Sequence, residues 1–263
     1  MRHEAPYGDL RERTVVVTGG NGGIGLGLAV GVGRAGAEVA IWGRSEAKNR
    51  IAVESLEEMG IVAHAIVCDV SNESSVVDAM TATLSRFERV DAMFANAGTA
   101  GNESAFVDLS LDDWHAVMRV DVDGVFLSLR AAARHMGERG GGGALVGVSS
   151  IVSRFGAARR AHYGAAKPAV EGLMRSLAVE LAPLRIRCNT LCPGWADTAM
   201  TGPGGAFGAA DYERFRKATV QRTPVRRWAD AEDFNAVAAF LADPTLLFHT
   251  GDSVVVDGGY TIC

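Results

Sequence analysis

The sequence predicts a single α/β domain, in which a doubly wound parallel sheet of seven strands carries helices on both faces. Short β-branched runs alternate with longer helical patterns along the 263 residues. The strand runs are almost continuously apolar, as expected where helices cover both faces of a parallel sheet. Hydrophobic residues make up 48% of the chain, enough for a sizeable core, and no linker or repeat divides it. We therefore expect residues 1–263 to form one domain.

The first half of the chain contains four predicted strands and three predicted helices. TVVVT, EVAIW, VAHAIVCDV and VDAMFANAG are short, apolar runs that are typical of buried strands. They cover residues 14–18, 38–42, 62–70 and 90–98. The segments between them have the apolar spacing of helices. These helices are expected at residues 23–34, 45–60 and 74–87.

The second half continues the alternation with two long helices. Strands are predicted at residues 143–150, 186–194 and 252–259, and helices at 111–136, 161–183 and 230–243. TGPGGAFGAADYER (201–214) is the one long stretch with weak secondary-structure signals. A loop of that length inside a compact domain is usually a lid or a binding loop. We therefore predict a flexible substrate lid near residues 197–227.

Composition argues against several classes of partner. The net charge of −5 disfavours nucleic acid as the main partner. No apolar stretch is long enough to cross a bilayer. The four cysteines form no CxxC pair, and the six histidines have no metal-ligand spacing. These features predict a cytoplasmic protein with reduced thiols and no metal site.

A glycine-rich segment joins the first predicted strand to the first helix. In TGGNGGIG (18–25), Gly19, Gly23 and Gly25 have G-x-x-x-G-x-G spacing, with Asn21 and Ile24 between them. Glycines allow a sharp turn and let a pyrophosphate approach the backbone, and the helix N-terminus offers free N–H groups. The segment therefore predicts a dinucleotide site.

The end of the second strand indicates which dinucleotide. An NAD site would carry an acid there for the ribose 2′-hydroxyl. Here Gly43, Arg44 and Ser45 follow the strand, and no acid is present. An arginine suits a 2′-phosphate. We predict NADP as the cofactor, with NAD as the alternative.

Tyr163 and Lys167 lie one helical turn apart, separated only by Gly164, Ala165 and Ala166. They should therefore share one helix face that leaves space for a ligand. A nearby ammonium favours the phenolate and lowers the pKa of a tyrosine. A phenol tuned in this way can give a proton to a carbonyl oxygen or take one from an alcohol.

The chain resembles the short-chain dehydrogenase/reductase (SDR) family from end to end. The matching stretches are TGGNGGIG (18–25), DV (69–70), ANAG (95–98), SS (149–150), YGAAK (163–167), PGWADT (193–198) and TGDSVVVDGG (250–259). The resemblance implies a Rossmann-type sheet of seven strands and a catalytic serine about 13 residues before Tyr163. Ser150 fits this spacing better than Ser149, which we interpret as a strand-end residue.

The family also implies roles for the matching residues. Ser150 would bond the substrate oxygen, Tyr163 would pass the proton, and Lys167 would tune Tyr163 and hold the nicotinamide ribose. Asp69 and Val70 would meet the adenine. Asn96, Ala97 and Gly98 would line the adenosine ribose and support the central strand. The nicotinamide pocket would be shaped by Pro193, Gly194, Ala196 and Thr198.

Asp121 departs from the family pattern, which has Asn at this position of an N-x-x-G-x-F stretch. In the family, the main-chain carbonyl at this position holds a water beside the catalytic lysine. The side chain could therefore serve only to shape the helix, which is the interpretation we favour. Alternatively, an ionised carboxylate near Lys167 would hold that lysine charged and oppose the Tyr163 phenolate.

The resemblance implies an oxidoreductase that transfers a hydride between NADP(H) and a small carbonyl or secondary-alcohol substrate. The alternatives are a cofactor-binding sensor without turnover, and an epimerase or dehydratase on the same fold. The family's usual tetramer, built on two long helices, implies a homotetramer through residues 111–136 and 162–182. Arg154, Arg159 and Arg160 could receive an anionic group or be solvated loop charges, and we favour the second interpretation.

Overall fold

A seven-stranded, all-parallel sheet forms the middle layer of the computed structural model, which describes residues 8–205 and 212–263. The strand order is β3-β2-β1-β4-β5-β6-β7, so the order reverses between β1 and β4. The strands are β1 (Thr14–Thr18), β2 (Glu38–Gly43), β3 (Ala63–Val67), β4 (Ala92–Ala95), β5 (Gly143–Val148), β6 (Ile186–Pro193) and β7 (Ser253–Val256). This architecture confirms the predicted fold class.

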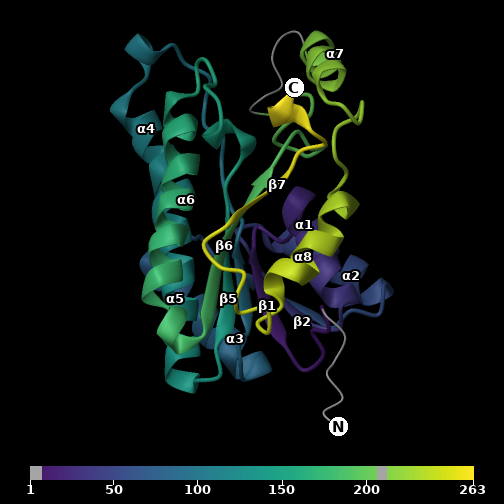
Figure 1. The fold of residues 1–263 in the computed structure, drawn as a ribbon, viewed down its shortest axis with the longest axis vertical. Helices are drawn as coiled ribbons and strands as arrows, with labels where there is room; N and C mark the ends of the chain where they lie inside the picture. The colour runs from purple at the N-terminus through teal and green to yellow at the C-terminus, as the bar shows by residue number, and fades with distance from the viewer. Residues whose placement is uncertain (1–7, 206–211) are drawn as a thin grey trace.

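Helices cover both faces of the sheet (Figure 1). One side carries α1 (Gly23–Arg34), α2 (Glu46–Glu58) and α8 (Asn235–Ala242). The other side carries α3 (Glu73–Phe87), α4 (Leu111–Met118), α5 (Gly124–Arg139) and α6 (Ala161–Glu180). A separate apolar core lies on each face, and both cores use side chains that alternate along the same strands. The sheet is therefore buried on both sides, as its apolar strands predict.

Polar residues before the helices explain where several of them begin. The side chains of Ser45, Asn72 and Ser110 accept hydrogen bonds from first-turn N–H groups of α2, α3 and α4. Such N-caps satisfy donors that the helix itself leaves without a partner. The helix α1 instead begins after Gly22 and has no side-chain cap. Its first N–H groups are left for another acceptor.

The structure corrects the predicted long helix over 111–136. A five-residue π-helical turn, η2 (Arg119–Asp123), separates α4 from α5. A π turn widens the helix by one residue and is frequent at functional sites. The apolar periodicity continues through the turn, so a sequence pattern does not reveal it.

A second correction concerns the predicted weak structure at 201–214. The helix α7 (Tyr212–Arg222) begins inside that stretch and continues beyond it. Phe215 on this helix packs edge-on against Trp195, with ring centroids 5.0 Å apart. The Thr219 hydroxyl accepts a hydrogen bond from the indole of Trp228. These tertiary contacts stabilise the helix, whose first three residues lie in the stretch with weak local signals. Residues 206–211 of the predicted lid lie outside the described residues.

Candidate active site

The carboxyl ends of the strands β1 to β6 border a cleft of about 420 Å³. It lies where the strand order reverses between β1 and β4, the usual place for a ligand in a doubly wound sheet. All the predicted site residues except Asp121 line this cleft. Segments that are far apart in the sequence therefore meet at one edge of the sheet.

The glycine segment after β1 forms one end of the cleft. Gly19 has a φ of 64°, a left-handed conformation that side chains disfavour. A Cβ atom on Gly25 would lie 2.2 Å from the Gly19 carbonyl oxygen, so no side chain fits there. The turn brings the uncapped N-terminus of α1 to the cleft. Free N–H groups and the positive helix end make this a site for a pyrophosphate.

Asn21 joins the glycine segment to the next βα unit. Its amide nitrogen donates to Asn49 Oδ1 at 2.7 Å, and Asn49 Nδ2 donates to the Gly43 carbonyl at 2.8 Å. The glycine loop and the end of β2 are therefore held together. This places the exposed Arg44 side chain at the rim of the same cleft.

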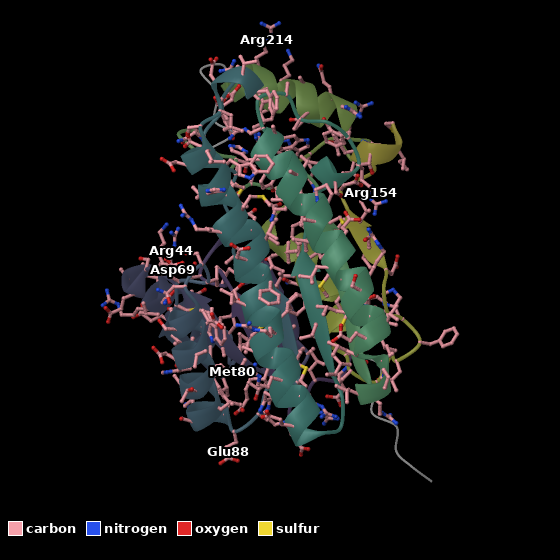
Figure 2. The ribbon with its side chains drawn as sticks, turned by 90° about the vertical axis from the view of Figure 1, so that its left-hand side faces the viewer. Arg44, Asp69, Met80, Glu88, Arg154 and Arg214 are labelled. Carbon is pink, nitrogen blue, oxygen red and sulfur yellow. The ribbon has the colours of Figure 1, made fainter. Side chains whose placement is uncertain are left out.

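Arg44 lies beside Asp69, which follows β3 (Figure 2). The Asp69 carboxylate accepts hydrogen bonds from the Ser71 hydroxyl and amide, which together with the Arg44 charge hold its pKa below the usual value despite partial burial. Val70 is buried against Gly124 at the start of α5. Lys48, also at the rim, is a cation that sequence reasoning missed. Its position four residues after Arg44 was the available signal.

Asn96 after β4 supports the centre of the sheet edge. Its amide nitrogen donates to the Thr18 carbonyl at 2.9 Å, and its backbone N–H donates to the Thr18 hydroxyl at 2.9 Å. These bonds fix the turn after β4 to the end of β1. Ala97 and Gly98 also line the cleft, and Gly98 lies close to the Lys167 ammonium.

The reactive residues come from β5 and α6. Tyr163 and Lys167 share one face of α6, and the ammonium lies 5.4 Å from the centroid of the tyrosine ring. Ser150, just after β5, hydrogen bonds the Tyr163 phenol. Ser149 instead donates to the Lys167 main-chain carbonyl at 2.9 Å. This contact agrees with the interpretation of Ser149 as a strand-end residue.

Burial changes the expected tuning of Tyr163. The side chain is buried, and this desolvation raises the pKa of its phenol. The Lys167 ammonium lowers that pKa, as the sequence predicts, but the carboxylate of Asp121 raises it again. The net direction is upward, because burial and Asp121 together outweigh the lysine.

Asp121 lies at the back of the cleft, in the π turn between α4 and α5. Its side chain is fully buried, and Oδ2 lies 3.0 Å from Lys167 Nζ. Our favoured interpretation, in which the side chain only shapes the helix, does not account for this contact. The widened turn is the physical reason, since it carries the residue inward to the lysine.

The three arginines before Tyr163 do not line the cleft. Arg160 is buried and donates to the main-chain carbonyls of Ala100 and Gly101, so it is a structural residue and not a solvated loop charge. Arg159 pairs with Glu103 at 2.9 Å. Arg154 lies on the opposite side of the molecule from Arg44, 3.9 Å from Glu171 (Figure 2).

The substrate end of the cleft is mainly apolar. Sequence reasoning did not identify its lining beside Ser150 and Tyr163, which comprises Ile151, Val152, Trp195, Ala199 and Met200. Trp195 belongs to PGWADT, the segment after β6, and stacks on Trp228 with ring centroids 5.8 Å apart. In the part of the chain that the structure describes, the basic side chains of the cleft are Arg44, Lys48 and Lys167.

PGWADT is held in place by main-chain contacts. Gly194 N–H donates to the Val256 carbonyl of β7 at 2.9 Å, and Ala196 forms an isolated parallel bridge with Ala229. Thr198 lies close to Gly23 in the glycine segment. Pro193, Gly194, Ala196 and Thr198 therefore line the same cleft as Tyr163. Within residues 8–205 and 212–263, no helix is long and apolar enough to cross a membrane and no metal-binding cluster occurs.

Comparison with known proteins identifies many relatives. A family model described as enoyl-(acyl carrier protein) reductase matches residues 19–261. The chain is 32% identical over 249 residues to the 3-oxoacyl-(acyl-carrier-protein) reductase FabG of Chlamydia pneumoniae, covering 95% of this chain and 97% of that protein. It is 37% identical over 250 residues to the cis-4-hydroxycyclohexanecarboxylate dehydrogenase of Sinomonas cyclohexanicum, with coverage of 95% and 97%.

Solved structures have the same fold. The crystal structure of a gluconate 5-dehydrogenase from Burkholderia cenocepacia J2315, in complex with NADP and tartrate, matches with a TM-score of 0.89. The two proteins are 33% identical, and the match covers 98% of each chain. The similarity therefore extends across the sheet, the cleft and the helices on both faces.

Proposed function

Because the chain belongs to the short-chain dehydrogenase/reductase family of NAD(P)-dependent oxidoreductases, we propose that it transfers a hydride between NADP(H) and a carbonyl or secondary-alcohol substrate, with Tyr163 as the general acid and base. The observation that carries this proposal is the grouping of Ser150, Tyr163 and Lys167 in the cleft beside the glycine segment.

The proposed mechanism assigns one task to each of these residues. Ser150 donates a hydrogen bond to the substrate oxygen and orients the carbonyl. Tyr163 gives its phenolic proton to that oxygen as it becomes an alcohol, and takes the proton back in the reverse direction. The Lys167 ammonium stabilises the phenolate formed between these steps. NADP(H), when bound, supplies or accepts the hydride.

The residues at the other end of the cleft fit such a cofactor. The tight approach of Gly25 to Gly19 and the uncapped start of α1 suit a pyrophosphate. Arg44 and Lys48 at the rim favour a ribose 2′-phosphate, and the residue directly after β2 is Arg44 rather than an acid. The gluconate 5-dehydrogenase from Burkholderia cenocepacia J2315 binds NADP. Together these observations support NADP over NAD.

The apolar substrate end supports a substrate whose reacting carbonyl carries an apolar body. Ile151, Val152 and Met200 would contact that body, whereas Arg154 lies outside the cleft. An anionic group on the substrate would meet no cation there other than Lys167, among the described residues. We expect a neutral cyclic ketone to be reduced more efficiently than its carboxylate-bearing analogue.

Exposed apolar side chains support the proposed homotetramer. Leu111 on α4, Phe126 on α5 and Val179 on α6 are 67%, 43% and 80% exposed, and their helices lie together on one face of the molecule (Figure 1). Covering such residues is a usual driving force for closed, symmetric assembly. We also propose that the segment near residues 197–227, of which 206–211 lie outside the described residues, acts as a substrate lid.

Tyr163→Phe tests the proposed activity. The variant lacks the transferable proton, so we expect turnover to fall at least about a hundredfold. NADPH affinity, measured by fluorescence titration, should stay within about threefold because the phosphate end is unchanged. Tyr260→Phe, at a tyrosine that lies outside both the cleft lining and residues 197–227, is the matched control and should keep full turnover. Near wild-type turnover in Tyr163→Phe would refute the assignment. Weak NADPH binding by the unaltered protein would refute the proposal that NADP(H) is its cofactor.

A panel of carbonyls and alcohols separates the proposal from its alternatives. A dehydrogenase changes nicotinamide absorbance with at least one substrate of the panel. An epimerase or dehydratase leaves the free cofactor pool unchanged, and a sensor turns over nothing. The grouping of Ser150, Tyr163 and Lys167 favours the dehydrogenase, since a sensor has no need of a proton donor.

A further inference from the structure

The buried contact between Asp121 and Lys167 has consequences for proton transfer. Asp121 Oδ2 lies 3.0 Å from Lys167 Nζ, and Oδ1 accepts a hydrogen bond from the Thr99 N–H at 2.7 Å. Both side chains of the ion pair are almost fully buried, at 0% and 5% exposure. The pair packs against the backbone of Gly98, where a Cβ atom would lie 3.2 Å from both charged groups.

This geometry requires two acceptor atoms at position 121. One oxygen faces the Thr99 N–H and the other faces the Lys167 ammonium, and both of these partners are donors. An asparagine in the same place would turn its amide NH₂ toward one of them. A carboxylate presents one oxygen to each donor, with Oδ1 in a hydrogen bond from Thr99 and Oδ2 in an ion pair with Lys167. Asp121 is therefore matched to this site, although the family has Asn in the resembling position.

The carboxylate also changes the charge of the buried group. Asp121, Lys167 and a protonated Tyr163 together carry no net charge, so loss of one proton leaves a buried negative charge. With a neutral residue at position 121, the same loss would convert a buried positive charge into a neutral pair. Desolvation penalises whichever state carries the net charge. Asp121 therefore opposes formation of the Tyr163 phenolate.

The electrostatic directions agree with this account. Burial lowers the pKa of Lys167, but Asp121 and Tyr163 raise it more, so the ammonium is retained. Burial raises the pKa of Tyr163, Lys167 lowers it, and Asp121 raises it again. Among the described residues, Arg160 and Cys192 also act electrostatically on this group. His162 accepts a hydrogen bond from the Tyr163 main-chain N–H, and Glu171 contacts Cys192. Burial raises the pKa of the Cys192 thiol to about 12, so it stays neutral.

We propose that Asp121 is a positioning residue that sets the direction of proton transfer: it holds Lys167 as an ammonium and keeps Tyr163 protonated, so that carbonyl reduction is favoured at neutral pH and alcohol oxidation begins only at alkaline pH. The proposal rests on the proposed role of Tyr163. In reduction, the carbonyl carbon gains a hydride, which NADPH, when bound, would supply as it becomes NADP⁺. The Tyr163 O–H bond breaks, its proton joins the substrate oxygen, and solvent later returns a proton to the phenolate.

The first test follows tyrosinate absorbance near 295 nm in the cofactor-free protein. Each titration is repeated in the same protein with Tyr163→Phe added, and the two absorbance curves are subtracted. The difference reports the ionisation of Tyr163 without that of the other three tyrosines. In the unaltered protein, Tyr163 should ionise above its ordinary value of about 10. Asp121→Asn should lower that midpoint by about 1 to 3 pH units, the range expected for removal of one nearby charge. Asp123→Asn, exposed on the same turn, should leave it unchanged.

Each outcome of this titration decides the proposal. An unchanged or higher midpoint in Asp121→Asn would overturn it, because the carboxylate would then be only structural. If Asp121→Asn does not fold, Asp121→Ser removes the same charge with a smaller side chain and should shift the midpoint in the same direction. The unaltered protein also provides a test, since ionisation of Tyr163 with a midpoint below about pH 10 contradicts the proposal without any variant at position 121.

The second test is the pH–rate profile in the alcohol-oxidising direction. The alkaline rise of kcat should move to lower pH in Asp121→Asn by the same amount as the tyrosinate midpoint. A loss of rate with an unmoved profile would indicate a purely structural role. These results are distinct from failure of the proposed function, since the absorbance titration needs neither substrate nor cofactor. Tyr163→Phe could keep near wild-type turnover while Asp121→Asn still lowers the tyrosinate midpoint. That result would support the effect of Asp121 on Tyr163 ionisation and refute its consequence for catalysis.

Discussion

Lys167→Met should reveal what the buried charge of Asp121 costs when its partner is removed. Methionine keeps the length and apolar stem of lysine but lacks the ammonium. The Asp121 carboxylate, at 0% exposure, then loses the contact at 3.0 Å and keeps only the hydrogen bond from the Thr99 N–H. Removing one partner of a buried ion pair typically destabilises a protein by about 3 to 5 kcal/mol.

Protonation limits the size of this effect. The stranded carboxylate can take up a proton, which costs about 1.36 kcal/mol for each pH unit above the unfolded-state value of about 3.9. The loss in free energy of unfolding that Lys167→Met can cause through the stranded carboxylate is therefore limited to about 4 kcal/mol at pH 7 and about 1.5 kcal/mol at pH 5. The direction of the pH dependence follows from linkage. A carboxyl that is harder to ionise in the folded state than in the unfolded state destabilises the folded protein at pH values above the unfolded-state pKa. This destabilisation becomes smaller as the pH falls toward that pKa.

The assay is equilibrium urea unfolding followed by tryptophan fluorescence, at pH 7 and pH 5 and one fixed protein concentration, since assembly makes apparent stability depend on concentration. Lys167→Met should lose about 3 to 4 kcal/mol at pH 7 and about 1.5 kcal/mol at pH 5. The double variant with Asp121→Asn should recover more than half of the loss at pH 7. Lys48→Met, at an exposed lysine, is the control. Equal losses at both pH values, or no recovery in the double variant, would refute the reasoning.

Three further predictions concern the cofactor, the fold and the assembly. Arg44→Asp should lower the ratio of kcat/KM with NADP to that with NAD at least about tenfold, since a charge-assisted contact is worth about 1.5 to 3 kcal/mol; an unchanged ratio would mean that Arg44 does not discriminate. Asp91→Asn should cost about 2 to 3 kcal/mol at neutral pH, because the buried carboxylate pairs with three arginines. Burial raises the pKa of Asp91, but those arginines and the Thr14 N–H lower it more, so the stabilisation exists above about pH 3.8 and the difference between the two proteins should narrow as pH falls below it. Light scattering should give a mass near four chains, and a monomer at all concentrations would contradict the proposed assembly.

The α/β alternation, the seven strands and the family were all predicted from sequence and are confirmed. These features follow from local patterns: continuous apolar runs mark buried parallel strands, and helical spacing marks the covering helices. The glycine segment, Arg44 and the Tyr163–Lys167 pair could be named for the same reason, since each is a short motif at fixed spacing. Their catalytic and binding roles stay predictions that the variants above test.

Tertiary structure decided the features that depend on distant contacts. The π turn that brings Asp121 to Lys167 has no signature in apolar spacing, and the two residues are 46 positions apart. The helix α7 begins inside the stretch of weak local signals at 201–214, and Phe215 and Thr219, just beyond that stretch, contact Trp195 and Trp228. Arg160 looked like a loop charge, but its partners are the carbonyls of residues 100 and 101. The net direction of the Tyr163 pKa also required the structure, since sequence spacing reveals the nearby ammonium but neither the burial nor the buried carboxylate that oppose it.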